Sequence, residues 1–121
     1  GDAMIGDGGE DMLGIDAPEL CQPWGERSRD ALAMRVMGRK VEAAPRGRDD
    51  HGRTLAPLLL DGEDVGAWMV AQGHAWSARW RGDRGPYARH EDAARRERRG
   101  LFSLPDPMQP YHFRRFHGPC R

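Results

Sequence analysis

The sequence predicts a single α+β domain, and three observations support this class. The chain has 121 residues, a usual length for one domain. Hydrophobic residues make up 38% of it, which is enough for one modest core. Short apolar runs typical of strands alternate with longer amphipathic segments typical of helices. No apolar run approaches the roughly 20 residues that a membrane helix needs, so a transmembrane protein is excluded.

The first third of the chain predicts a loop, a strand end and a helix. Residues 1–11 are rich in glycine and acidic residues, which favours a loop or tail. Residues 12–15 are mostly apolar and indicate the end of a buried strand, and Pro18 restricts the turn that follows. A helix is expected over about residues 23–38, because its apolar residues form a stripe and a glycine closes it.

The middle of the chain predicts two strands and a short helix. Residues 41–44 favour a short strand, and residues 45–53 favour a turn. Residues 54–60 are the most apolar stretch and predict a second strand, in which Pro57 implies an edge or a bulge. A short amphipathic helix is expected over residues 64–72, with its large apolar side chains facing inward.

Arginine and aromatic residues are frequent in the C-terminal part. Residues 74–85 are expected to be irregular. Residues 86–99 predict a strongly charged helix, with Pro86 in its first turn and Gly100 after its end. Residues 101–121 contain four prolines, which favours a tail packed onto the rest of the domain.

Charge is distributed unevenly along the chain. The 19 basic and 19 acidic residues cancel, but residues 1–78 carry a net charge of −6 and residues 79–121 a net charge of +6. Such asymmetry indicates a polyanion or an acidic partner for the C-terminal part. The sequence leaves open an alternative, a solvated helix face in a chain that uses arginine as its basic residue. Its only lysine is Lys40.

The chain has two cysteines, Cys21 and Cys120, one towards each end. Their spacing fits no zinc-binding pattern. A disulfide between them would close a loop of about 100 residues and add on the order of 4 kcal/mol in the chain-entropy model. Such a bond requires an oxidising compartment, so a secreted or periplasmic location is expected if it forms. Two unrelated thiols are the open alternative.

Seven short motifs follow one another in the sequence. They are Gly14-Ile15-Asp16-Ala17-Pro18-Glu19, Gln22-Pro23-Trp24-Gly25, Asp49-x-His51-Gly52-Arg53-x-x-Ala56, Asp61-Gly62-x-x-Val65, Val70-x-x-Gly73-His74-Ala75-Trp76, Tyr87-x-x-x-Glu91 and Arg98-Arg99-Gly100-Leu101-Phe102. In this order and register, the chain resembles the staphylococcal (thermo)nuclease-like family over about residues 12–104. This leaves residues 1–11 as an N-terminal segment and residues 105–121 as a proline-rich tail.

The resemblance implies an OB-type barrel with three helices and a nuclease that cleaves DNA or RNA phosphodiesters with calcium. It implies that Asp16 binds the calcium ion, that Glu19 positions or activates the attacking water, and that Arg53 stabilises the pentacovalent phosphate. The chemistry suits these residue types. Calcium takes hard oxygen ligands, a carboxylate can deprotonate water, and a guanidinium matches the geometry of phosphate.

Four further residues are candidates for substrate binding. His51 can donate a hydrogen bond to phosphate, although a surface loop histidine is the plainer interpretation. Arg79, Arg81 and Tyr87 belong to an arginine-rich stretch with interleaved aromatics, which can bind a phosphate backbone and stack bases. A solvated helix with internal ion pairs is the alternative for this stretch.

The chain also departs from the family pattern. Asp11 stands where the family usually places an arginine, and the 15 residues before Asp16 are too few for the family's first hairpin. We therefore expect an N-terminally incomplete barrel, with exposed strand edges that favour self-association. A catalytically degenerate module that binds nucleic acid or a protein partner is the alternative to a working nuclease.

Overall fold

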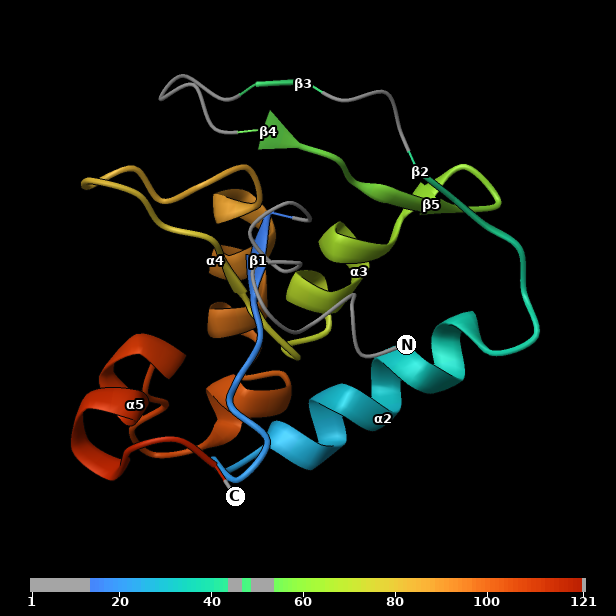
Figure 1. Ribbon diagram of the computed structural model, residues 1–121. Coiled ribbons are helices and arrows are strands. Elements are labelled where there is room, and N and C mark those ends of the chain that lie inside the picture. The colour runs from blue at the N-terminus through green and yellow to red at the C-terminus, as the bar shows by residue number, and fades with distance from the viewer. Residues whose placement is uncertain (1–13, 44–46, 49–53, 121) are drawn as a thin grey trace.

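The computed structural model describes residues 14–43, 47–48 and 54–120 (Figure 1). The expected loop at residues 1–11 and most of the expected turn at residues 45–53 lie outside this part. The described helices are α2 (Gly25–Val36), α3 (Val65–Ala71), α4 (Ala88–Arg96) and α5 (Pro110–His117), with a 3-10 turn, η2 (Gly100–Ser103). The described strands are β1 (Ile15–Asp16), β2 (Val41–Ala43), β3 (Gly47–Arg48), β4 (Thr54–Leu55), β5 (Leu58–Leu60), β6 (Glu63–Asp64) and β7 (Trp76–Ser77).

The described strands form three small antiparallel sheets. β1 pairs with β7, β3 pairs with β4, and β5 lies between β2 and β6. This mixture of helices and strands confirms the α+β class. The described strands do not close into a barrel, and the described residues contain four α-helices where the resemblance implied three. None of the described helices is long and apolar enough to cross a membrane.

Apolar side chains from helices and strands form two adjoining clusters. The larger cluster centres on α3, whose apolar face packs against β5 and α4. Its buried members are Ile15, Leu32, Leu60, Val65, Met69, Val70, Ala75 and Tyr87. The smaller cluster joins β7 to α4 and η2 through Trp76, Ala94, Leu101 and Phe102. Both clusters therefore pack against the β1–β7 pair.

Local chemistry explains how two of the observed elements differ from their expected ranges. Helix α2 begins at Gly25, two residues later than expected, because Trp24 adopts a left-handed backbone with φ of 75°. The expected strand over residues 54–60 is divided into β4 and β5, because Pro57 has no N–H to donate to a ladder. β5 is the central strand of its sheet, so Pro57 marks an interruption rather than an edge.

Helix α5 was not expected from the sequence. The four prolines of residues 101–121 favoured a packed tail without a helix of its own, but Pro110 occupies the first turn of α5, where a missing N–H costs nothing. Figure 1 shows α5 beside the body of the domain, with the described C-terminal end close to the start of α2. Residues 101–121 therefore contain regular structure, most of η2 and all of α5, that the prediction of a packed tail did not include.

His74 lies between two tryptophans and is held in its neutral form. Trp24 Nε1 donates a hydrogen bond to His74 Nδ1 at 3.1 Å, and the rings of Trp24 and Trp68 lie 6.3 and 5.7 Å from the imidazole. Because Nδ1 accepts this bond, it carries no proton in the folded state. Desolvation by burial lowers the pKa of His74.

We expect the free energy of unfolding to decrease as the pH falls below about 6.5. The unfolded chain then binds a proton at residue 74 that the folded chain excludes, so acid favours unfolding until the pH passes below the folded-state pKa. Urea titrations between pH 7.5 and 5.5 measure this slope. His74→Asn, which keeps an acceptor for Trp24, is expected to flatten it, while His112→Asn on the exposed face of α5 should leave it unchanged. An unchanged slope in His74→Asn would contradict the assignment.

Candidate functional site

Asp16 and Glu19 lie at the end of β1, on the segment that leads into α2. Asp16 is the last residue of β1 and pairs in register with Trp76 of β7. Both acidic residues are half-buried, whereas Pro18 between them is buried. The structure thus brings the two carboxylate-bearing residues onto one braced segment, as the sequence predicts.

Contacts with the start of α2 fix the backbone of Glu19. The backbone N–H of Glu19 donates to Gln22 Oε1 at 2.9 Å. The carbonyl oxygen of Glu19 accepts a hydrogen bond from the backbone N–H of Gln22, also at 2.9 Å. Gly25 packs so closely that a Cβ there would lie 2.0 Å from the Glu19 carbonyl oxygen. Only glycine fits at this first residue of α2, so the close approach itself sets the position of the Glu19 segment.

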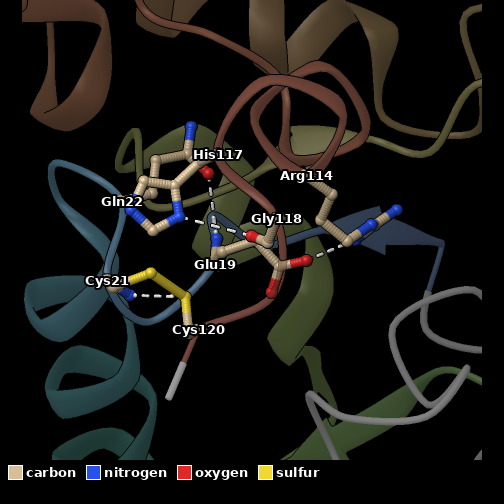
Figure 2. Close-up of a disulfide and its surroundings, with 7 residues drawn as sticks. All are labelled: Glu19, Cys21, Gln22, Arg114, His117, Gly118 and Cys120. Atoms are coloured by element: carbon tan, nitrogen blue, oxygen red, sulfur yellow. Dashed lines mark hydrogen bonds and ion pairs between the residues drawn. A yellow bond between two sulfur atoms is a disulfide. The ribbon is translucent and has the colours of Figure 1, made fainter.

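The C-terminal helix reaches the same segment. Arg114 Nη1 of α5 lies 2.5 Å from Glu19 Oε1 (Figure 2). Cys21 and Cys120 form a disulfide with a Cα–Cα distance of 5.6 Å, and Cys21 N donates to Cys120 Sγ at 3.0 Å. The disulfide is the pairing that the sequence left open. It joins Cys120, three residues beyond the end of α5, to Cys21, two residues beyond Glu19.

Arg79 belongs to an internal ion-pair cluster. Its two terminal nitrogens lie 2.8 and 2.5 Å from the two carboxylate oxygens of Glu91, whose side chain is fully buried. Arg84 and Arg95 also bind Glu91 Oε2, and Ser77 N donates to Glu91 Oε1 at 3.0 Å. The guanidinium expected to bind substrate is therefore engaged by a carboxylate inside the fold.

The cluster keeps Glu91 ionised. Burial alone would raise the pKa of this carboxyl group, but hydrogen bonds from Arg79 and Arg95 outweigh it and lower the pKa to about 2. The i,i+4 pair between Glu91 and Arg95 is the internal helix pair that the alternative interpretation of this stretch proposed. Glu91 thereby connects β7 to α4.

Tyr87 and Arg81 lie in different environments. Tyr87 is 6% exposed, and its hydroxyl donates to Asp64 Oδ2 at 2.5 Å, so its described contacts are those of a core residue and not of a substrate-binding surface. Burial, together with this hydrogen bond, raises the pKa of Tyr87 above its usual range. Arg81 is exposed, with its guanidinium carbon 5.4 Å from the ring centroid of Trp80. His51 and Arg53 lie outside the described residues.

Comparison with known proteins identifies the family. Residues 11–104 match the family model described as "Staphylococcal nuclease homologue". The chain belongs to this family. The match covers the Asp16–Glu19 segment and the Glu91 cluster, and it ends before α5 begins.

Several curated relatives carry related names. The chain is 36% identical over 104 residues to the probable staphylococcal-like nuclease CAN2 of Oryza sativa subsp. japonica, a match that covers 86% of this chain and 28% of that protein. It is 38% identical over 116 residues to the micrococcal nuclease of Shigella flexneri, covering 86% and 66% of the two chains. It is 38% identical over 115 residues to Protein ParB of Escherichia coli, covering 86% and 65%. The chain spans between 28% and 66% of the length of these relatives.

The calcium ion implied by the family needs more ligands than the described side chains offer. Asp16 provides one hard oxygen donor at the end of β1. No group of three or more His, Cys, Asp or Glu side chains in residues 14–43, 47–48 and 54–120 is arranged to hold a metal ion. Because calcium takes about six to eight oxygen ligands, these side chains do not by themselves form a calcium site.

Sequence reasoning missed three contributors to this site. Gln22 and Gly25 were part of a family motif, but their bracing role depends on how the loop folds back onto α2. Arg114 lies 95 residues from Glu19 in a region without a family motif. The cysteine pair was the available signal, because a bridge between Cys21 and Cys120 would bring the C-terminal segment to Glu19.

We expect Glu91→Gln to reduce the free energy of unfolding at pH 7 by about 3 kcal/mol, because it removes the buried charge that pairs with the partly exposed guanidinium groups of Arg79, Arg84 and Arg95. Urea denaturation measures the change. Glu97→Gln, which alters a 57% exposed side chain at the end of α4, serves as the matched control and should cost less than about 1 kcal/mol.

The same pair of proteins tests the pKa of Glu91. The stabilisation from Glu91 is present above its usual pKa of 4.5 and is lost as the pH falls towards 2. The difference between wild type and Glu91→Gln should therefore shrink in that window. Equal unfolding free energies at pH 7 would show that the cluster does not stabilise the fold.

Proposed function

We propose that this chain is a nuclease that hydrolyses phosphodiester bonds in DNA or RNA by attack of water on phosphorus. The observation that carries the proposal is the braced Asp16–Glu19 segment, which holds two partly exposed carboxylates three residues apart at the end of β1. Membership of the staphylococcal nuclease homologue family and the names of the relatives support the same reaction.

Glu19 is proposed to act on the attacking water. A general base must hold its carboxylate within hydrogen-bond reach of the water and in a fixed orientation. The hydrogen bonds with Gln22 and the close packing on Gly25 support that role, because they fix the backbone from which the Glu19 side chain projects. Arg53 is proposed to stabilise the charge that develops on phosphate.

The reaction is proposed to depend on calcium. This dependence comes from the family, and Asp16 is the proposed carboxylate ligand. The oxidising location expected from the sequence is likewise proposed, and the disulfide between Cys21 and Cys120 supports it. Self-association through strand edges stays a prediction.

A second candidate function is binding of nucleic acid without cleavage. The observation that favours it is the exposed pair of Trp80 and Arg81, since an aromatic ring and a guanidinium at the surface can stack bases and contact phosphate. Binding of a single-stranded oligonucleotide in EDTA, with no cleavage when calcium is added, would support this function over hydrolysis.

We expect the purified protein to cleave fluorescently labelled single-stranded DNA or RNA in calcium and to lose this activity in EDTA. Glu19→Gln should lower the rate about 10²–10⁴-fold, because the amide cannot take a proton from water. Arg53→Ala should lower it by about 10²–10³-fold. Glu42→Gln on the exposed face of β2 is the matched control and should leave the rate unchanged. Full activity in Glu19→Gln would overturn the assignment of Glu19.

A further inference from the structure

We propose that Arg114 is a positioning residue for Glu19, and that the Cys21–Cys120 disulfide keeps it in place. The inference rests on the proposed function, because it assumes that Glu19 takes part in hydrolysis. It concerns an element outside the matched family domain, since the family model ends at residue 104 and α5 begins at Pro110.

The contact with Arg114 orients the Glu19 carboxylate and still leaves one of its oxygens for the attacking water. Arg114 Nη1 contacts Oε1 of Glu19, so this carboxylate oxygen is anchored, and the other oxygen, Oε2, is the one proposed to face a water molecule. Glu19 has 27% and Arg114 51% of its side chain exposed, so the pair is open to solvent at the site. An anchored carboxylate loses rotamer freedom before the substrate arrives, which favours an oriented base.

The charge of Arg114 also suits its place. Asp16 and Glu19 put two negative charges close to where an anionic phosphate must approach. A guanidinium beside Glu19 offsets this repulsion.

The body of the domain holds α5 weakly. Pro110 is the helix's buried residue, whereas Tyr111 and Phe116 are 55% and 83% exposed. Phe113 lines a pocket of about 380 Å³ together with Trp76 and Leu101 of the core. Gln22 Nε2 donates to the Met108 carbonyl just before α5. Beyond the other end of the helix, the chain is tethered by the disulfide between Cys21 and Cys120, which Figure 2 shows. These two tethers, rather than apolar packing, set the position of Arg114.

The decisive experiment measures kcat and KM for cleavage of a labelled single-stranded oligonucleotide in calcium. Arg114→Gln is expected to lower kcat about tenfold with KM within twofold of wild type, and Arg114→Lys to restore part of the loss. Arg115→Gln removes the same charge from the next residue of α5, whose guanidinium contacts Tyr111, and should leave both constants within twofold. In the Glu19→Gln background, Arg114→Gln should have no further effect, because it acts through Glu19.

A second arm tests the disulfide. Cys21→Ser/Cys120→Ser is expected to lower kcat as much as Arg114→Gln does, and combining the two changes should add nothing. Circular dichroism must show the variant folded under the assay conditions. If it does not fold, Arg114→Gln, which leaves the disulfide intact, decides the outcome.

The possible failures are distinguishable. If the wild type cleaves and Arg114→Gln has an unchanged or higher kcat, this inference alone is overturned. A higher kcat would also show that α5 inhibits the site. An equal loss from Arg114→Gln in the wild-type and Glu19→Gln backgrounds also overturns it, since the role is then structural. A folded wild type that never cleaves overturns the proposed function, and this inference with it.

Discussion

The buried carboxylate of Glu91 is the interaction on which the arrangement of the candidate site depends. It receives a hydrogen bond from the backbone of Ser77 in β7 and charged hydrogen bonds from three arginines around α4. Because β7 pairs with β1, this cluster fixes the strand that ends in Asp16. The paired charge of Glu91 thus gives this small domain rigidity. In a domain with longer strands, the hydrogen bonds between strands would provide it.

The sequence predicted the elements whose signals are local. Helix α3 and strand β2 follow from periodicity and from the turns beside them, and Asp64 caps α3 as its side-chain chemistry favours. Pro57 predicts a disturbance of the strand over residues 54–60, because proline cannot donate to a ladder. Whether that disturbance is an edge, a bulge or a break between β4 and β5 depends on which strands pair, and the sequence does not show this. Helix α5 could not be predicted, because a short helix is marginal alone and this one depends on a bond across 99 residues.

The candidate site divides in the same way. Asp16 and Glu19 belong to one short motif, so a resemblance finds them together. The roles of Arg79 and Tyr87 depend on what lies opposite them in three dimensions, namely Glu91 and Asp64, and composition does not supply that information. An arginine-rich stretch therefore indicated a surface for phosphate, whereas part of it neutralises a carboxylate inside the fold.

The disulfide has a topological consequence. It links residues 21 and 120, so most of the chain forms a covalent ring from which the N-terminal segment extends. A protease that cuts once anywhere between the two cysteines opens this ring without releasing a fragment. Under oxidising conditions, the connection between the Glu19 segment and the C-terminal helix thus survives a nick that would divide a linear chain in two.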